Sequence, residues 1–205
     1  MIRRIAAAIR RLWYNSAWRL LSVYRVFRTT LYRTDVGRWQ EVASREPSWD
    51  SRNRLIAHMI PANASVIDLG SGAQTLARYL GPGCRYQPCD CVKSSDNVLL
   101  CDFNNDQYPE THEEFDYVVV SGLLEYIRDP GKFLAQIRSY GDVLLISYAP
   151  HEPGQTRAWR TSQGWLNHLT KSGLEHLFSD LDFAWNAVGQ WHEQTIYRVQ
   201  RNKSS

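Results

Sequence analysis

The chain has 205 residues, a formal net charge of +3 and a hydrophobic share of 43%, which is ordinary for a globular protein. This length suits one α/β domain with a short extension. The charge is uneven, because residues 1–50 contain ten Arg and four acidic residues, whereas residues 51–205 contain fourteen Lys and Arg and seventeen Asp and Glu. An enzyme that acts on nucleic acid carries its positive field around the active site, so we expect no nucleic-acid partner.

Residues 2–31 place apolar side chains at spacings of three and four, which predicts one amphipathic helix with most Arg residues on its other side. No acidic residue comes before Asp35, and such a helix suits contact with an anionic membrane surface. The plainer interpretation is a helix that packs on the remaining chain or on a partner subunit, which would allow an oligomer. An Arg-rich, acid-poor N-terminus is also typical of a mitochondrial transit peptide. We divide the chain into a basic amphipathic helical extension at 1–49 and one domain at 50–205.

No apolar run approaches the roughly 20 residues that cross a bilayer, and Arg residues interrupt every stretch that resembles the centre of a secretory signal. We therefore expect a cytoplasmic protein, peripheral at the membrane surface if residues 2–31 bind there. The cysteines fall within eighteen residues without a Cys-x-x-Cys pair, which predicts small buried side chains on two adjacent strands in a reduced setting, and no metal site. They are Cys84, Cys89, Cys91 and Cys101.

Residues 34–50 look like a connector, and a helix is expected from about 51 to 60, with Asp50 as its cap. Strand and helix patterns alternate after it. The last two strand-like runs predict an antiparallel hairpin, because parallel strands need a long crossover. The whole pattern predicts an α/β fold: a Rossmann-like doubly wound sheet, mostly parallel with a C-terminal antiparallel β-hairpin, plus N-terminal helices. The predicted strands are 65–69, 84–88, 97–101, 115–120, 142–147, 183–188 and 195–199, and the predicted helices are 74–80, one that starts at Asp129-Pro130, and about 171–179.

Acidic residues stand at the ends of the first three predicted strands. Asp68 belongs to a Gly-rich turn in which Gly70 and Gly72 allow the backbone to approach a ligand closely. Asp90 follows twenty-two residues later, which is about the separation at which nucleotide-binding folds place a ribose-binding acid. Asp102 ends the third strand. Because ligands of open α/β sheets bind beyond the carboxyl ends of the strands, we expect the three carboxylates to meet in one crevice.

Residues 66–72 (VIDLGSG) resemble motif I of the class I methyltransferases, which closes around the methionine moiety of S-adenosylmethionine. The resemblance implies that Asp90 binds the ribose hydroxyls and that Asp102 and Phe103 contact adenine. Residues 115–127 (FDYVVVSGLLEYI) resemble motif IV of the small-molecule enzymes, with Tyr126 where a His is frequent. Gln74 replaces the third Gly of motif I. The residues implied to bind the cofactor are Asp68, Gly70, Ser71, Gly72, Asp90, Cys91, Asp102, Phe103, Ser121 and Leu123.

Two other classes of protein share parts of this pattern. A nicotinamide-dependent Rossmann enzyme would need Gly at Thr75, and it usually has an apolar residue where Asp68 stands. Both positions argue against that class. A non-catalytic S-adenosylmethionine-binding or interaction module on the same scaffold is the alternative, because fold does not fix function.

The absence of certain motifs reduces the classes of acceptor that we expect. Residues 121–124 (SGLL) stand where base-methylating enzymes of DNA carry an Asn/Asp-Pro-Pro-Tyr-like run, and neither the paired-glutamate loop of protein-arginine enzymes nor the metal set of catechol-type enzymes is visible. We expect a small-molecule, glycan or lipid-linked acceptor, with O-methylation without metal as the preferred reaction. A hydroxyl acceptor benefits from a general base, and the catalytic candidates are His151, just past the fifth strand, and His168. Each also has a plain structural interpretation. Trp159 and Trp165 suit either an aromatic wall or the core.

Overall fold

The computed structural model describes residues 20, 23–24, 27–28, 33–43 and 49–202. The predicted N-terminal helix at 2–31 therefore lies largely outside the described residues, and the five of its positions that are described are helical. Within the described ranges, no helix combines the length and the apolar character that crossing a bilayer requires.

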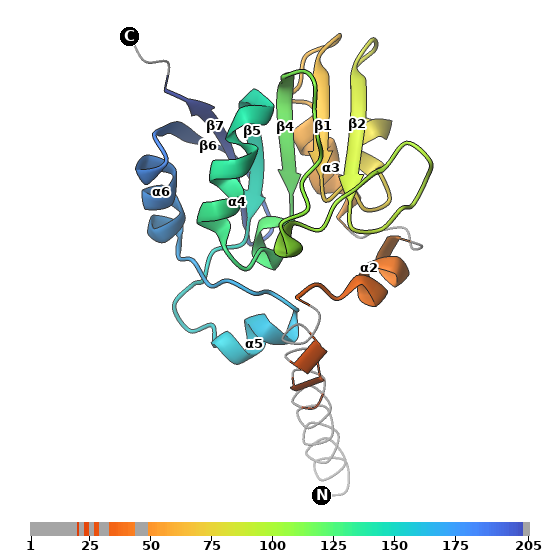
Figure 1. The fold of residues 1–205 in the computed structure, drawn as a ribbon. Coiled ribbons are helices and arrows are strands. Elements are labelled where there is room, and N and C mark those ends of the chain that lie inside the picture. The colour runs from red at the N-terminus through yellow and green to blue at the C-terminus, as the bar shows by residue number, and fades with distance from the viewer. Residues whose placement is uncertain (1–19, 21–22, 25–26, 29–32, 44–48, 203–205) are drawn as a thin grey trace, which may run out of the picture.

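A seven-stranded sheet forms the centre of the molecule (Figure 1). Its strand order is β3-β2-β1-β4-β5-β7-β6, so the order reverses between β1 and β4. The strands β1 to β5 pair in parallel, whereas β7 is antiparallel to both β5 and β6. The predicted fold class, including the C-terminal antiparallel hairpin, is confirmed. The strands are β1 (Ser65–Leu69), β2 (Arg85–Asp90), β3 (Leu99–Leu100), β4 (Phe115–Ser121), β5 (Gly141–Tyr148), β6 (Phe183–Trp191) and β7 (Gln194–Arg201).

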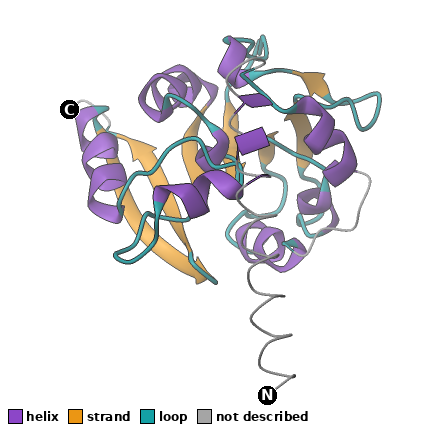
Figure 2. Cartoon of the chain, turned by 90° about the horizontal axis from the view of Figure 1, so that it is seen from below, coloured by secondary structure: helices purple, strands orange, loops and turns teal. Residues whose placement is uncertain are grey.

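Helices cover both faces of this sheet, and others lie beyond the carboxyl ends of its strands (Figures 1 and 2). Alternate side chains of a strand point to opposite faces. Val118 and Val120 of β4 accordingly join the core beneath α4 and α6, whereas Val119 joins the core beneath α3. Figure 1 places α2 and α5 at the carboxyl end of the sheet. The helices are α2 (Val36–Ala43), α3 (Asp50–Ala57), α4 (Pro130–Ile137), α5 (Arg157–Ser162) and α6 (Lys171–Asp180).

One helix has the cap predicted from the sequence, and another helix does not. The Asp129 carboxylate accepts a hydrogen bond from the backbone N of Lys132 at 3.0 Å, and Pro130 occupies the first turn of α4, as predicted. The predicted cap at Asp50 is wrong, because α3 begins with no side-chain cap. The Asp50 carboxylate instead accepts a hydrogen bond from the hydroxyl of Tyr79.

Three predicted elements differ from the structure. The connector at 34–50 contains α2. The predicted helix at 74–80 is only a 3-10 turn, Thr75–Arg78, because Gln74 adopts a left-handed conformation (φ 56°) immediately before it. The predicted third strand at 97–101 is reduced to two residues, because it is an edge strand that pairs with β2 alone.

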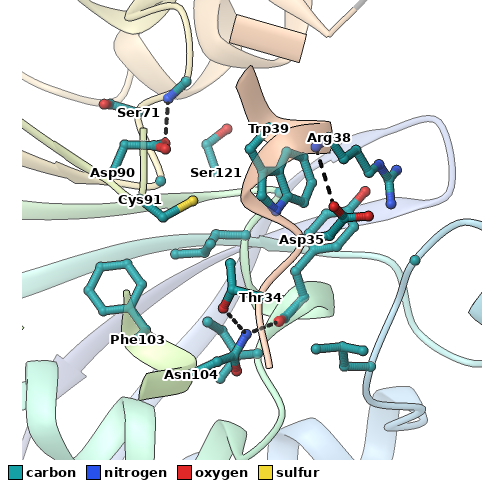
Figure 3. Close-up of a pocket in the computed structure, with 18 of the residues that line it drawn as sticks. Thr34, Asp35, Arg38, Trp39, Ser71, Asp90, Cys91, Phe103, Asn104 and Ser121 are labelled. Atoms are coloured by element: carbon teal, nitrogen blue, oxygen red, sulfur yellow. Dashed lines mark hydrogen bonds between the residues drawn. The ribbon is translucent and has the colours of Figure 1, made fainter. Parts of the chain in front are cut away.

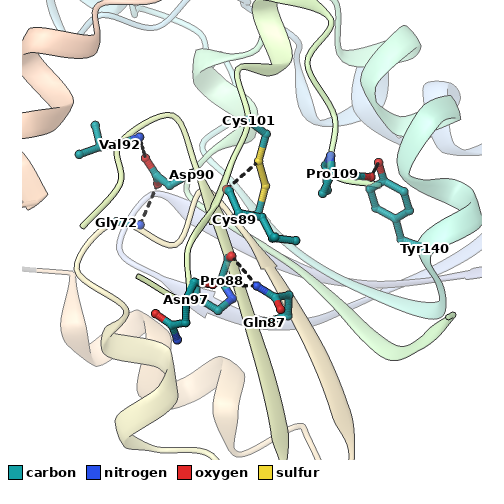
Figure 4. Close-up of a disulfide and its surroundings, with 11 residues drawn as sticks. Gly72, Gln87, Pro88, Cys89, Asp90, Val92, Asn97, Cys101, Pro109 and Tyr140 are labelled. Atoms are coloured by element: carbon teal, nitrogen blue, oxygen red, sulfur yellow. Dashed lines mark hydrogen bonds between the residues drawn. A yellow bond between two sulfur atoms is a disulfide. The ribbon is translucent and has the colours of Figure 1, made fainter. Parts of the chain in front are cut away.

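Cys89 and Cys101 form a disulfide between β2 and the residue that follows β3 (Figure 4). The parallel pairing of β2 with β3 and a hydrogen bond from the backbone N of Cys101 to the carbonyl of Asp90 bring the two Cα atoms to 6.4 Å. The expectation of buried side chains is confirmed for this pair, although Cys101 follows β3 and does not lie in it. The expectation of free thiols is wrong for this pair. Cys84 and Cys91 are free and partly buried.

Arg160 of α5 organises the long connection between β5 and α6. Its side chain is fully buried, and its guanidinium donates hydrogen bonds to the carbonyls of Ala149 at 2.9 Å and Pro150 at 3.1 Å. It also lies over the ring of Trp165 at 4.4 Å. Since buried carbonyls need a donor, this one cation holds the connection against the end of the sheet.

Replacing Arg160 with Met should destabilise the fold by about 2–4 kcal/mol, because the carbonyls that it binds would stay buried without a donor. Urea unfolding of the purified protein measures this loss. The matched control is Arg157→Met, on an exposed position of the same helix, which should change the unfolding free energy by less than about 0.5 kcal/mol. Equal effects of both variants would contradict the role given to Arg160.

Candidate functional site

A cavity of about 220 Å³ lies at the carboxyl ends of the strands, where the strand order reverses. The turn after β1 and the ends of β2, β3 and β4 form its inner wall. Two segments from elsewhere in the chain, residues 33–39 and 164–166, contribute the rest of the lining together with α3 and the β6–β7 hairpin. All ten residues predicted to bind the cofactor line this cavity: Asp68, Gly70, Ser71, Gly72, Asp90, Cys91, Asp102, Phe103, Ser121 and Leu123.

Backbone hydrogen bonds hold the Gly-rich turn in place. The amides of Gly70 and Ser71 both donate to the carbonyl of Cys89, at 2.8 and 3.1 Å, and the amide of Gly72 donates to the Asp90 carboxylate at 2.9 Å. The turn is therefore fastened to the end of β2. Burial raises the pKa of the Asp90 carboxyl, and the hydrogen bond from Gly72 opposes this rise.

The glycines of the turn and Ser71 leave room and a free polar group for a ligand. Gly72 has φ +51°, and a Cβ added there would meet no atom within 4 Å. Gly70 has φ +77°, and a Cβ there would lie 3.0 Å from a methyl carbon of Leu123. The hydroxyl of Ser71 is buried and has no hydrogen-bond partner. Buried hydroxyls are normally paired, so this hydroxyl is suited to pair with a bound ligand.

Gln74 takes over the conformational role of the third glycine of the motif. It has φ 56° and ψ 31°, which is the left-handed region that glycine enters most easily. Its side-chain amide donates to the hydroxyl of Ser95 at 2.5 Å and to that of Ser94 at 3.3 Å. The side chain thus ties the turn to the loop after β2, which no glycine could do.

Asp68 is almost fully buried at the end of β1, with 2% of its surface exposed. Its carboxylate accepts a hydrogen bond from the hydroxyl of Tyr86 at 2.7 Å. Burial raises the pKa of Asp68 to about 7, against the lowering effects of the Tyr86 hydrogen bond and of the charge on Arg52. The cavity therefore contains a carboxyl group that changes charge near neutral pH.

Arg52 of α3 lines the cavity and was not visible as a site residue in the sequence. Its guanidinium donates to the hydroxyl and the carbonyl of Ser121, at 2.9 and 3.1 Å, and to the side-chain oxygen of Gln194 at 3.0 Å. It packs on Gly122, where a Cβ would lie only 2.2 Å from one of its nitrogens. Only 6% of Arg52 is exposed, and burial lowers the pKa of its guanidinium. No motif marks this position, because a helix and a distant hairpin create the site together.

The segment at 33–39 covers the cavity (Figure 3). The hydroxyl of Thr34 donates to the Asp102 carboxylate at 2.6 Å, and the side-chain amide of Asn104 approaches the same hydroxyl at 3.4 Å. Trp39 meets the ring of Tyr126 edge-on, with centroids 4.6 Å apart. The sequence treats this segment as a connector, and only the tertiary contacts reveal that it closes the site.

The two histidines predicted as catalytic candidates lie outside the lining of the cavity. The ring of His151 lies 2.9 Å from the carbonyl of Gln155, and the Nδ1 atom of His168 accepts a hydrogen bond from Arg160 at 3.3 Å. Burial and the charge of Arg160 lower the pKa of His168. The chain turns away after β5, where the amide of His151 bonds to the carbonyl of Leu169, so the structure does not bring either ring to the cofactor residues.

The two tryptophans of the same region differ in exposure, and only one of them lines the cavity. Trp165 lines the cavity and is 7% exposed, whereas Trp159 is 44% exposed and packs edge-on against it, with ring centroids 5.6 Å apart. Trp165 therefore has the place of an aromatic wall. Among the described residues, no group of three or more His, Cys, Asp or Glu side chains is placed to hold a metal ion.

Comparisons with known proteins show the family and the fold of the chain. A family model described as a methyltransferase domain matches residues 39–187, which is more than half of the chain. A strand order of 3-2-1-4-5-7-6 and three acids at successive strand ends define the class: a class I methyltransferase fold with a nucleotide-type cofactor crevice. The chain belongs to the methyltransferase domain family. A sequence search among curated proteins finds no match.

Solved structures share the fold at low identity. A methyltransferase of calicheamicin biosynthesis, CalO1, solved with S-adenosylhomocysteine, has 16% identity and a TM-score of 0.55 over 75% of this chain and 54% of its own. Human N-acetylserotonin methyltransferase, solved with S-adenosylmethionine, has 16% identity and a TM-score of 0.62 over 85% and 59%. The chain thus spans little more than half of either protein. The [4+2]-cyclase SpnF has 11% identity and a TM-score of 0.56 over 74% and 80%, so the fold by itself does not determine the reaction.

The raised pKa of Asp68 predicts how stability depends on pH. Its folded pKa of about 7 lies above the unfolded value of about 3.9, so the carboxyl is neutral in the folded protein at about pH 5 and must ionise inside it at about pH 8. Between these pH values the folded state should lose about 2–3 kcal/mol through this group. The variant Asp68→Asn should lack this loss, as measured by urea unfolding at both pH values.

The control for this prediction is Asp96→Asn, which changes an exposed carboxylate in the loop after β2. It should keep the pH dependence of the unmodified protein. Parallel stability profiles for Asp68→Asn and the unmodified protein would show that Asp68 does not titrate in this range.

Proposed function

We propose that the protein is an S-adenosylmethionine-dependent methyltransferase that acts on a small-molecule, glycan or lipid-linked acceptor, with a hydroxyl oxygen as the preferred acceptor atom. One observation carries the proposal: the Gly-rich turn, including Ser71, and the carboxylates of Asp68, Asp90 and Asp102 line one cavity. Membership of the methyltransferase domain family supports it. When bound, S-adenosylmethionine supplies a methyl group on a positively charged sulfonium.

The groups around the cavity match the parts of this cofactor. Asp90 would accept hydrogen bonds from ribose hydroxyls, and Asp102 with Phe103 would contact the adenine. At the other end, the Arg52 guanidinium suits the cofactor's carboxylate, and Asp68 suits its ammonium group. The open space beside Gly72 lets the cofactor lie against the backbone.

The contribution of the chain to the reaction is positioning and exclusion of water. Methyl transfer requires the acceptor to approach in line with the bond that breaks, and holding both partners in that geometry removes most of the entropic barrier. The cavity walls from β4, residues 33–39 and residues 164–166 restrict the directions from which an acceptor can enter. Trp39, Tyr126 and Trp165 are largely apolar walls and limit the access of water.

Replacing Asp90 with Asn should weaken binding of S-adenosylmethionine by about 10- to 100-fold, because charge-assisted hydrogen bonds to the ribose would be lost. Isothermal titration calorimetry on the full chain measures this change. The matched control Asp96→Asn, in the exposed loop that follows, should bind as the unmodified protein does. Absence of binding to the unmodified protein would refute the proposed cofactor.

Catalysis is tested separately from binding. The purified protein, incubated with methyl-labelled cofactor and a cell extract, should place label in a discrete metabolite identified by mass spectrometry, and Asp90→Asn should reduce that labelling. Cofactor binding without any labelled product would instead favour the non-catalytic module.

We further propose that the N-terminal segment at 2–31 holds the enzyme on an anionic membrane surface. The apolar side chains described there are exposed: Leu20 by 72%, Val23 by 68%, Phe27 by 61% and Tyr24 by 53%. Large apolar groups so exposed need a partner. The segment has many Arg residues and no acidic residue before Asp35. A surface of anionic lipid headgroups is therefore the partner whose charge is complementary to it.

In flotation with vesicles of phosphatidylcholine and phosphatidylglycerol, the full chain should rise with the lipid, and it should stay below with phosphatidylcholine alone. The double variant Val23→Glu with Phe27→Glu should lose most of the binding, because it removes apolar contacts and adds negative charge. The control variant Arg138→Glu alters charge by a similar amount on the surface of the folded domain. Equal flotation of all three proteins would refute membrane contact through this segment.

A further inference from the structure

We propose that the acceptor carries an anionic group, a carboxylate or a phosphate, which binds the guanidinium of Arg38 on the side of the cavity away from the cofactor residues. This inference rests on the proposed function, since it names the class of acceptor for the same site. It follows from the charges that remain in the cavity once the cofactor's own charges are matched.

The cofactor accounts for most of the charged groups in the lining. Its ribose, adenine and ammonium group are complementary to the carboxylates of Asp90, Asp102 and Asp68, and its carboxylate is complementary to Arg52. The remaining charged side chains of the lining are Asp35, Arg33 and Arg38. Asp35 forms an ion pair with Arg28 at 3.0 Å. The unmatched charge at the cavity is therefore positive.

The backbone amide of Arg38 donates to the Asp35 carboxylate at 3.4 Å, but its guanidinium is held at the cavity by packing and not by an acid. Its guanidinium lies 4.9 Å from the ring centroid of Trp39 and 5.4 Å from that of Tyr126. It is pressed against Gly164, where a Cβ would lie only 1.9 Å from one of its nitrogens. Within the described part of the chain, no carboxylate lies within ion-pair distance of Arg38. Its fork of donors is thus preorganised and available to a ligand.

Gly164 makes this arrangement possible for a conformational reason as well. It has φ +82°, a region that disfavours other residues, and it stands at the turn between α5 and the segment that lines the cavity. Any side chain at this position would push Arg38 away from the cavity. The glycine therefore lets the cover segment and the connection after β5 meet closely around one cation.

The walls beside Arg38 indicate the body of the acceptor. Trp39, Tyr126 and Trp165 come from three separate parts of the chain and line the same cavity. Such rings accommodate a flat or apolar group by stacking, and the adjacent guanidinium, which is weakly hydrated, suits a carboxylate or phosphate on that group. The acceptor is accordingly an amphipathic anion, with a ring or apolar body next to its charge.

The test uses the full chain saturated with S-adenosylhomocysteine, which lacks the transferable methyl group. Two probes of nearly equal shape are titrated by calorimetry: 4-hydroxybenzoate, which is anionic, and 4-hydroxybenzamide, which is neutral. We expect the acid to bind at least about tenfold more tightly than the amide. Arg38→Gln should reduce this ratio to about one, and Arg38→Lys should keep part of it, because Lys retains the charge but not the bidentate fork.

The control Arg138→Gln removes another arginine that lies over an aromatic ring, that of Phe183. Unlike Arg38, Arg138 lies at the surface and forms an ion pair with Asp182. It should leave the ratio of the two affinities unchanged. Equal affinity for acid and amide, or failure of both to bind at about 10 mM, would overturn the inference even if Arg38→Gln did not fold. These outcomes are distinct from failure of the proposed function, in which S-adenosylhomocysteine itself would not bind.

Discussion

The site depends on how the turn after β1 is fastened to the end of β2. Two successive amides of the turn, those of Gly70 and Ser71, donate to the single carbonyl of Cys89, and the next amide donates to the Asp90 carboxylate. A ligand can approach this turn only because its glycines take positive φ values and leave open space beside Gly72. The carboxylate that shapes the turn is also the one expected to bind ribose, so the loop and the cofactor share one anchor.

A second constraint comes from burial of opposite charges at one end of the cavity. Asp68 and Arg52 are both almost fully buried. Burial raises the pKa of Asp68 and lowers the pKa of Arg52, so it favours the neutral form of each group. They interact through space without forming an ion pair at contact distance. The Arg52 guanidinium instead donates hydrogen bonds to Ser121 and Gln194. A zwitterionic ligand end, with one positive and one negative group, would restore favourable partners to both.

The cover segment links the N-terminus of the chain to this chemistry. Thr34 donates to Asp102, the carboxylate expected at the adenine, while Arg38 and Trp39 pack on the ring of Tyr126. The ion pair between Arg28 and Asp35 connects the cover to the helical residues that precede it. Residues 1–50, which hold ten Arg and only four acidic residues, therefore also contribute part of the wall of the cavity.

The alternation of strands and helices, the C-terminal hairpin and the acids at strand ends could all be predicted from sequence, because they depend on local periodicity and on short motifs. That is why Asp68, residues 70–72, Asp90 and Asp102 are found in one cavity as expected. Local patterns gave a wrong prediction at Gln74, whose left-handed conformation limits the predicted helix to one 3-10 turn. They also gave a wrong prediction for Cys89 and Cys101, because the disulfide between them depends on the register of two strands.

Arg52, Arg38 and the cover at 33–39 could not be found in the same way. Each is placed by contacts with residues far away in sequence, such as Gly122, Gly164 and Asp102, and no spacing in the chain records those contacts. A contact that is distant in sequence also explains why His151 does not line the cavity. The residue follows the carboxyl end of β5, but its backbone amide donates to the carbonyl of Leu169. The sequence by itself determined the fold and the acidic and Gly-rich residues that line the crevice at the strand ends, since these follow from local motifs on a regular sheet. Only the tertiary structure decided which residues form the opposite wall of the cavity, because that wall is assembled from segments that are far apart in the sequence.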